Sequence, residues 1–286
     1  MTALLFATDL HGNERSYEQL WALATERAPT AVVLGGDLFP WPRGPDLLRG
    51  QRAFVQGPFA AGLRALRERA PELRVFAIPG NDDWAACVPD LEALEQESLL
   101  ELLHLTARPL SLETSDHEAG PWIAGYACVP ITPFKMSDWD RLDVPGWEPE
   151  KVNERPYLSD TGQVREGTIA EVRARPTIEA DLAHLATLSP PARTVYVTHS
   201  PPYETNLDRM HGQRPIGSHA LRAFVEAHQP PLTLHGHVHE SPRLTGEISD
   251  QLGRTLCVNP GDSRQRLRAA WVELEDVVGT LERLNG

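Results

Sequence analysis

Short apolar runs along the chain predict five buried strands. Each run is rich in β-branched or aliphatic side chains and leads into glycine, proline, aspartate or histidine. The runs are residues 3–8, 31–34, 74–78, 194–198 and 232–235. Helical spacing of apolar residues lies between them at 14–27 and 59–70, and Ser218 is expected to cap a helix that ends at His228. Strands that alternate with helices predict a parallel sheet with crossover helices.

A different pattern begins near Leu110 and predicts that part of the architecture is antiparallel. Runs with short connections at 110–114, 121–127, 254–258, 269–275 and 278–283 read as further strands. Residues 134–176 lose periodicity, and so long an irregular stretch is usually functional or mobile. Its aromatic residues, among them Trp139, Trp147 and Tyr157, suit either a small core of the insert itself or a lid that stacks on an organic ester group. We expect one domain over 1–286 with this insert as a candidate lid.

Composition and charge narrow the class of protein. The chain has 286 residues, of which 41% are hydrophobic and 23% charged, as in folded globular domains. The formal net charge of -13 argues against an extended grip on nucleic acid or on an anionic membrane. The cysteines Cys87, Cys128 and Cys257 form no CxxC pair, and no signal peptide or membrane span is evident, so we expect a cytoplasmic protein. No pattern indicates an oligomeric state.

Polar side chains with the chemistry of metal ligands follow all five predicted strands. Because the carboxyl ends of parallel strands share one edge of a sheet, we expect these residues to converge there. The residues are Asp9, His11, Asp37, Asn81, His199, His237 and His239. The pairs Asp-x-His and His-x-His are expected to be extended, so that both side chains of a pair point the same way.

The donor set indicates two transition-metal ions. Carboxylate, imidazole and amide donors without thiolate suit Mn(II), Fe, Zn, Co or Ni, and do not resemble magnesium, calcium or structural zinc sites. Seven donors are too many for one four-coordinate ion, but they fit two ions that share a carboxylate. Two metals about 3.5 to 4 Å apart are a known device for in-line displacement at phosphorus.

Five ordered blocks of this sequence resemble the calcineurin-like metallophosphoesterase superfamily. The blocks are Asp9-x-His11, Gly35-Gly36-Asp37, Gly80-Asn81, His199 and Gly236-His237-x-His239. Further stretches, such as His199-Ser200-Pro201-Pro202, are similar to a bacterial and archaeal subgroup of predicted cytoplasmic phosphoesterases. The resemblance implies an α/β four-layer sandwich of two mixed β-sheets, packed face to face and flanked by helices.

The resemblance also implies how the residues hold the metals. Asp37 would bridge two divalent ions, manganese being expected first, and a water or hydroxide between the ions would attack phosphorus. The first ion would be held by Asp9, His11, Asp37 and His239, and the second by Asp37, Asn81, His199 and His237.

One position departs from the family pattern. Most members carry a histidine after the motif asparagine, and this chain has Asp82 there. Three interpretations stay open: a protonated Asp82 donates to the leaving group, His211 in a later loop donates, or the leaving groups need no proton. Arg209 and Arg214 are candidates to bind the substrate phosphate, although Asp208 is equally placed to hold Arg209 in a surface ion pair.

These residues together predict a dinuclear metal-dependent phosphohydrolase. The missing histidine favours a phosphodiesterase for a small diester such as a cyclic nucleotide, with Asn81 contacting substrate as well as metal. A phosphomonoesterase or nucleotide pyrophosphatase is the alternative within enzymes. A non-catalytic scaffold is the alternative outside enzymes, but it requires missing ligands, and all seven are present.

Overall fold

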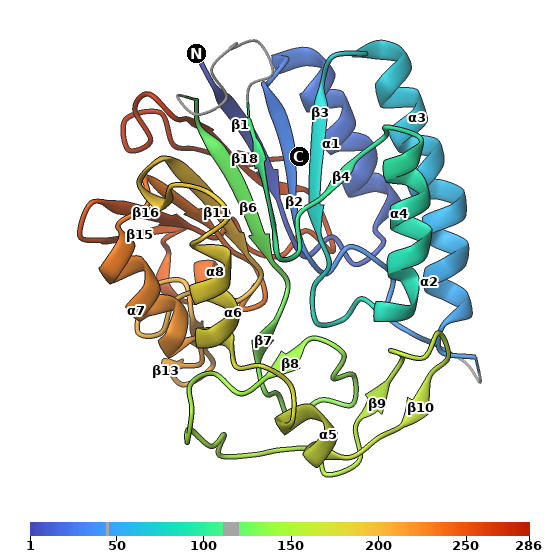
Figure 1. Cartoon of the computed structure of the whole chain (residues 1–286). Helices are drawn as coiled ribbons and strands as arrows, with labels where there is room; N and C mark the ends of the chain where they lie inside the picture. Colours follow the sequence, from blue (N-terminus) through green and yellow to red (C-terminus); the bar gives the residue numbers. More distant parts are fainter. Residues whose placement is uncertain (44–45, 111–119) are drawn as a thin grey trace.

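Two six-stranded β-sheets lie at the centre of the molecule in the computed structural model, which describes residues 1–43, 46–110 and 120–286 (Figure 1). The first sheet consists of β1 Ala3–Ala7, β2 Ala31–Gly35, β3 Arg74–Ile78, β4 Glu101–Leu102, β17 Arg268–Glu273 and β18 Glu282–Asn285. Its strand order is β18-β17-β1-β2-β3-β4. Strands β1 to β4 are parallel, whereas β17 runs antiparallel to β1 and to β18.

The second sheet is also mixed. It consists of β5 Thr106–Pro109, β6 Trp122–Tyr126, β11 Thr194–Thr198, β14 Leu232–Leu234, β15 Ser249–Leu252 and β16 Thr255–Val258. Its strand order is β15-β16-β14-β11-β6-β5. The four inner strands are parallel, and only the edge strands β5 and β15 are antiparallel to their neighbours.

Helices cover the outer face of each sheet and complete four layers (Figure 1). The α-helices of the described residues are α1 Glu14–Arg27, α2 Arg49–Phe54, α3 Ala60–Arg69, α4 Val88–Gln96, α5 Ile169–Arg173, α6 Ile178–Leu185, α7 His219–His228 and α8 Ser241–Thr245, and of these α5 belongs to the insert rather than to a layer. In β1, Leu4 and Phe6 face the core between the sheets, and Leu5 and Ala7 face the core beneath α1 and α3. This alternation buries both faces of the sheet and confirms the four-layer sandwich.

The predicted strands and helices are found, but the five strands that precede the ligand candidates divide between the two sheets rather than forming one. The prediction that part of the architecture is antiparallel is confirmed, because β6 pairs antiparallel with β5, β16 with β15, and β17 with both β1 and β18. The sequence did not indicate that β6 and β16 also have a parallel neighbour, β11 and β14 respectively, because a strand can insert beside a segment that is distant in the chain.

Two predicted elements have other boundaries in the structure, and a third predicted element lies mostly outside the described residues. The helix predicted at 59–70 is α3, and α2 and a π-helical turn at Val55–Phe59 precede it without a break. Pro58 lies inside this turn, where a proline usually ends or kinks an α-helix. The last strand is β18 rather than 278–283, because a turn occupies 276–280. Residues 111–119, which include most of the strand predicted at 110–114, lie outside the described residues.

The insert at 134–176 lies below both sheets in Figure 1 and contains regular structure. It carries β8 Asp140–Arg141, which pairs with β7 Val129–Pro130, the hairpin of β9 Tyr157–Leu158 and β10 Arg165–Glu166, and α5. Aliphatic residues form its small core, namely Ile131, Leu158, Ile169 and Val172. Trp139 instead joins the main core, so the insert's own core is not built from its aromatic residues.

Among the described residues, none of the helices has the length and apolar composition needed to cross a membrane.

Candidate metal centre and cavity

The seven ligand candidates converge where the strands of both sheets end. Asp9, Asp37 and Asn81 follow β1, β2 and β3 of the first sheet, while His199 and His237 follow β11 and β14 of the second. The two sheets are packed with these carboxyl ends on the same side, above the insert (Figure 1). The convergence predicted for one sheet edge is therefore achieved by two sheets together.

Four of the seven ligand candidates lie in left-handed turns, and neither of the two pairs is extended. The φ angles of Asp9, His11, Asp37 and His237 are 53°, 44°, 52° and 61°. Residues other than glycine seldom adopt this region, although Asn, Asp and His do so more readily than most, and such conformations concentrate at functional sites. The extended geometry predicted for Asp-x-His and His-x-His was wrong, because the strands end before the ligands and the chain turns at each of them.

Glycines make room for these turns. A Cβ on Gly236 would overlap Thr8 and the Asp9 carboxylate, and a Cβ on Gly80 would overlap the backbone and the carboxylate of Asp37. Any side chain at either position would displace a ligand residue.

Asp37 lies at the centre of the cluster, with its two oxygens facing different histidines. Its Oδ1 is 3.4 Å from His199 Nε2, and its Oδ2 is 3.8 Å from His11 Nε2. The Asp82 backbone N–H donates to the same Oδ1 at 2.8 Å. Two groups of side chains that could each hold an ion share Asp37: one with Asp9 and His199, the other with His11 and Asp82. Both groups contain Asp37, but they divide the other residues differently from the two ligand sets that the resemblance implies. A carboxylate in this position can bridge two ions.

Asp37 and His199 form a buried ion pair. Burial opposes ionisation of Asp37, but His199 and then His11 outweigh it and hold the pKa of Asp37 well below its usual range. Burial likewise opposes the charged form of His199, but Asp37 and then Asp9 raise the pKa of this histidine to about 9. A divalent cation between them would replace that proton, because histidine binds metals in its neutral form.

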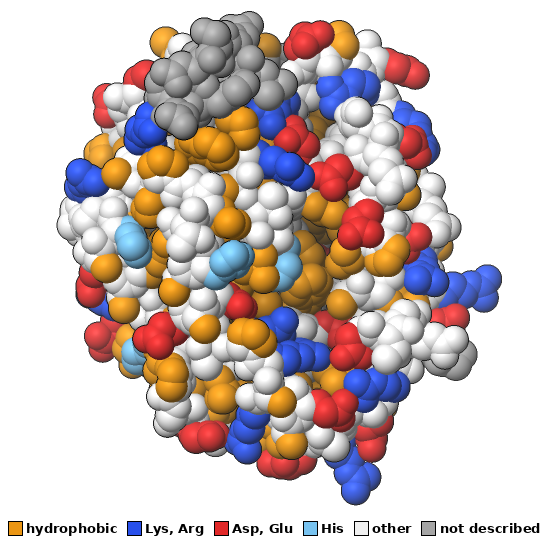
Figure 2. All heavy atoms as spheres, viewed as in Figure 1, with side chains coloured by type: hydrophobic (Ala, Val, Ile, Leu, Met, Phe, Trp, Pro, Cys, Tyr) orange, Lys and Arg blue, Asp and Glu red, His pale blue; other side chains and the backbone are white. Residues whose placement is uncertain are grey.

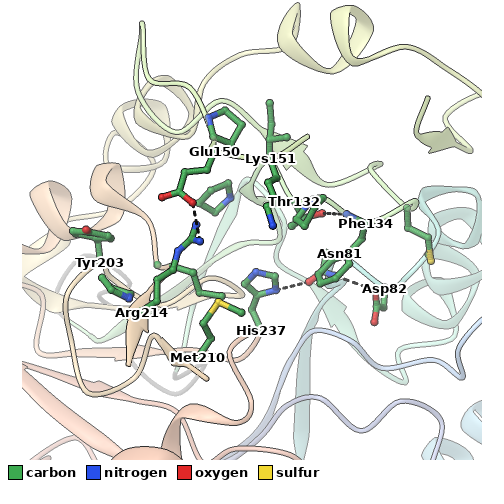
Figure 3. Close-up of a pocket in the computed structure, with 18 of the residues that line it drawn as sticks. Asn81, Asp82, Thr132, Phe134, Glu150, Lys151, Tyr203, Met210, Arg214 and His237 are labelled. Carbon is green, nitrogen blue, oxygen red and sulfur yellow. Dashed lines mark hydrogen bonds and ion pairs between the residues drawn. The ribbon is translucent and has the colours of Figure 1, made fainter. Parts of the chain in front are cut away.

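Asn81 joins the two histidines of the second sheet. His199 Nε2 lies 3.1 Å and His237 Nδ1 lies 2.6 Å from Asn81 Oδ1, as Figure 3 shows for His237. Burial lowers the pKa of His237 to about 3, and His199 adds to the effect, so the ring is neutral at ordinary pH. These contacts gather the residues that the resemblance assigns to the second ion.

Several buried atoms of the cluster have no hydrogen-bond partner among the described residues. They are Asp9 Oδ1, both ring nitrogens of His11, and His239 Nδ1. Burial lowers the pKa of His11 to about 4 and also lowers that of His239. Buried polar atoms are almost always satisfied, so unpartnered oxygens and neutral imidazole nitrogens that face one another fit divalent cations.

Asp82 lies at the edge of the cluster and borders the cavity. Trp41 Nε1 donates to its Oδ2 at 2.7 Å, and Asn81 Nδ2 donates to its Oδ1 at 3.0 Å. Burial and the charge of Asp37 raise the pKa of Asp82 to about 7, while the two hydrogen bonds oppose the shift. The carboxylate is thus held against the ligands rather than turned toward solvent.

A cavity of about 960 Å³ opens over this cluster, between the insert and the loops of the second sheet (Figure 3). Asp37, Asn81, His237 and His239 contribute to its floor. Its wall includes residues 130–136 and 147–151 and the segment around Arg214. The volume far exceeds that of a phosphate group, so the cavity has room for the organic part of an ester.

The three predicted residues of the later loop have different positions. Arg214 lines the cavity and pairs with Glu150 of the insert at 2.7 Å (Figure 3). Arg209 does not line the cavity, and its guanidinium donates to the carbonyls of Thr205 and Gln213. His211 is exposed in the turn between β12 Arg209–Met210 and β13 Arg214–Pro215 and does not line the cavity either.

Two further residues hold the loops of the ligand candidates together, a role that the sequence did not indicate. Asp83 is buried and accepts the backbone N–H groups of Leu38, Phe39 and Gly80. Asn259 Nδ2 lies 3.3 Å from the backbone carbonyls of Gly236 and Val238, which flank His237, and from that of Leu207, so Asn259 lies beside the site. Neither residue belongs to a ligand block, so only the fold brings them to the site.

Comparisons with known proteins agree with this geometry. A family model described as calcineurin-like phosphoesterase matches residues 2–241. No curated protein gives a significant sequence match. Among solved structures, the protein TT1561 of Thermus thermophilus aligns with a TM-score of 0.59 and 19% identity, over 99% of this chain and 98% of that chain. A dimetal phosphatase from Danio rerio aligns with a TM-score of 0.51 and 12% identity, over 94% and 91% of the two chains. At these identities the two structures show that the fold is shared.

Proposed function

This chain belongs to the calcineurin-like phosphoesterase family and is a metal-dependent phosphoester hydrolase, and we propose that it hydrolyses a small phosphodiester such as a cyclic nucleotide at a centre of two divalent cations. The similarity to a dimetal phosphatase supports the count of two ions. The nitrogen and oxygen donors support manganese as the first candidate. All three cysteines are free and buried, which supports a cytoplasmic location.

We propose that Asp37 bridges the ions, with Asp9, His11 and His239 on one side and Asn81, His199 and His237 on the other. The neutral state of His11, His237 and His239 suits them to bind metal. When bound, two divalent cations stabilise charge on the phosphoryl oxygens and lower the pKa of a water that can act as nucleophile. The chain itself fixes the ligands and lines the space that receives the ester.

The observation that carries the diester proposal is the carboxylate of Asp82 beside Asn81, where most family members have histidine. A phosphomonoester carries close to two negative charges near pH 7, whereas a diester carries one. When Asp82 is ionised it disfavours a monoester more than a diester, and when it is protonated it supplies no positive charge for the second charge of a monoester. The size of the cavity also suits a phosphate with organic groups on both sides.

The role of Asp82 as proton donor is a separate proposal that leaving groups can test. If Asp82 donates to the leaving oxygen, Asp82→Ala should slow poorly activated esters more than nitrophenyl esters, which need no proton. Equal losses on both kinds of ester would remove Asp82 as the acid. His211→Ala is the companion variant, since His211 is the other candidate that the sequence indicates.

A substrate panel tests the proposed function. Protein purified without chelators should be assayed with bis-nitrophenyl phosphate, mono-nitrophenyl phosphate, and 2′,3′- and 3′,5′-cyclic nucleotides, each with Mn(II), Zn(II) and Ni(II). We expect the diesters to give a kcat/KM at least about 10-fold above that of the monoester, equivalent to about 1.4 kcal/mol of discrimination. A preference for the monoester would overturn the diester proposal. Elemental analysis that finds no transition metal, even after addition of Mn(II), would overturn the metal centre.

A further inference from the structure

The two lysines of this chain have an unusual distribution. Of its 27 basic side chains, 25 are arginine, and only Lys135 and Lys151 are lysine. Both lie in the insert, and both line the cavity over the metal ligands, although fewer than a tenth of all residues do so. On the face drawn in Figure 2, basic and acidic side chains are interspersed. Arginine is thus the cation used throughout the chain, and lysine is confined to one wall of the cavity.

Lysine and arginine differ in what they can bind. Arginine presents a wide planar fork, whereas the lysine ammonium is a compact point charge with three donors on a flexible stem. A single phosphoryl oxygen in a narrow space close to metal ions can be approached by an ammonium more easily than by a guanidinium. Because lysine occurs only on this wall, the cavity is the one place in the chain where a compact lysine ammonium is available to a phosphoryl oxygen.

The contacts of the three Lys and Arg side chains in the cavity wall distinguish Lys151 from the other two. Arg214 is paired with Glu150 at 2.7 Å. The ammonium of Lys135 lies over the ring of Tyr157, 5.5 Å from its centre. Lys151 has no ion pair with any described residue, and Figure 3 shows it extending from the insert into the cavity, with its amino group directed toward the floor that holds Asn81 and His237.

Acidic side chains outnumber lysine and arginine in the cavity lining. Asp37, Asp82, Glu148, Glu150 and Glu240 all line the cavity, and Glu150 is paired with Arg214. An anionic diester that approaches the metal ions is repelled by these carboxylates, and the ammonium of Lys151, unpaired among the described residues, reduces that repulsion.

We propose that Lys151 is a substrate-contacting residue whose ammonium binds a non-bridging oxygen of the scissile phosphate from the insert side. The metal ions would hold the phosphate from the floor and Lys151 from the wall, so the insert would contribute directly to the site. This inference rests on the proposed function, since it needs a phosphoester in the cavity. It assigns a role to a residue outside all the family blocks.

The first experiment compares the two lysines as a matched pair. Removal of one charge-assisted hydrogen bond should lower kcat/KM of Lys151→Ala for bis-nitrophenyl phosphate by about 10- to 100-fold. Lys135→Ala should stay within about twofold, because the Lys135 ammonium is already engaged by Tyr157. A Lys151→Ala variant as active as wild type, or equal losses in both variants, would overturn the proposal.

Chemical rescue separates the loss of charge from a loss of folding. The three native cysteines are buried, so a single exposed cysteine in Lys151→Cys can be alkylated selectively with bromoethylamine, which restores an ammonium at nearly the same length. We expect the alkylated protein to regain at least a third of the wild-type kcat/KM, and Lys135→Cys treated in the same way to change little. Failure of the alkylated Lys151→Cys protein to recover would count against a role for the charge.

A footprint of lysine acetylation tests the contact without any measurement of activity. The Mn(II)-loaded wild-type protein is acetylated with and without inorganic phosphate, and peptides are analysed by mass spectrometry. Arg141 lies between the two lysines, so cleavage at arginine separates them. Phosphate should protect Lys151 at least about threefold more than Lys135, and equal protection would overturn the proposal. If wild type hydrolyses no ester, the proposed function fails, and this footprint alone decides whether Lys151 binds phosphate.

Discussion

The floor and the insert wall of the cavity have opposite physical character. On the floor and directly beneath it, Asp37, Asp9 and His199 are at most 3% exposed and are held in left-handed turns, by hydrogen bonds or by an ion pair. On the wall, the side chains of Arg214 and Glu150 are 51% and 69% exposed and are joined by one ion pair. Burial holds the floor side chains in one arrangement, whereas the exposed side chains of the wall can break their ion pair and contact a ligand or solvent instead. We infer that the floor carries the chemistry and the wall selects the substrate.

The largest effect should come from breaking the floor at Asp37. Asp37→Asn removes the carboxylate whose two oxygens face different histidines, so we expect loss of at least one metal ion and a fall in kcat/KM of about 1,000-fold or more. Activity and metal content per chain measure the two effects. Asp160→Asn, which removes a half-exposed carboxylate of the insert, is the control for the substitution. Two metals bound per chain in Asp37→Asn would contradict the bridging role.

The next largest effect should be a loss of stability on substitution of Asp83, which holds together the loops that carry Asp37 and Asn81. Asp83→Ala leaves the buried N–H groups of Leu38, Phe39 and Gly80 without their acceptor, which should lower the free energy of unfolding by about 3 kcal/mol or more. Urea denaturation measures this loss. Asp276→Ala removes an exposed acceptor of the Gly279 N–H and should cost under about 1 kcal/mol. Equal losses in the two variants would show that Asp83 does not tie the loops.

The floor could be predicted from the sequence far better than the wall. Short apolar strands and the polar residues directly after them are local features, so the clustering of the seven candidates and most strand positions followed from the pattern. Strand partners are set by packing between distant segments, so the parallel pairing of β6 with β11 and of β16 with β14 could not be predicted from local spacing. The left-handed turns at Asp9 and His237 were missed for a related reason, because the alternation that continues through Asp-x-His indicates an extended chain.

The wall left weaker signals, because exposed positions tolerate many residues. The loop arginines were predicted to bind phosphate from their charge, but Arg209 is turned into its own loop and Arg214 is paired with the insert. Nothing local marks Lys151, and only the scarcity of lysine across the whole chain distinguishes it.

A smaller effect should come from the anchor of the insert, where Asp140 is buried. Burial raises the pKa of Asp140 from 3.8 to about 7, although hydrogen bonds from Thr132 and Ser137 oppose the shift. The folded state therefore holds this proton more tightly than the unfolded chain does. The contribution of protonated Asp140 to the free energy of unfolding is complete below about pH 4 and is lost as the pH rises to about 7.

Asp140→Asn removes this titration and should flatten the pH dependence of stability. Between pH 5 and pH 8, wild type should lose about 2 kcal/mol more unfolding free energy than the variant, as urea denaturation at the two pH values would measure. Equal losses would mean that Asp140 does not hold a proton in the folded state.

The smallest effect should come from the wall itself, at the ion pair of Glu150 and Arg214. Because both side chains are half-exposed, Glu150→Gln should change the free energy of unfolding by less than about 0.5 kcal/mol. The same change releases Arg214 and removes a carboxylate from the cavity rim, so KM for an anionic diester should fall about two- to threefold at low salt and less at high salt. Glu166→Gln is the matched control, since Glu166 pairs with Arg155 on the insert but does not line the cavity. If Glu150→Gln lowers kcat and leaves KM unchanged, the wall acts in the chemical step, and the division between floor and wall fails.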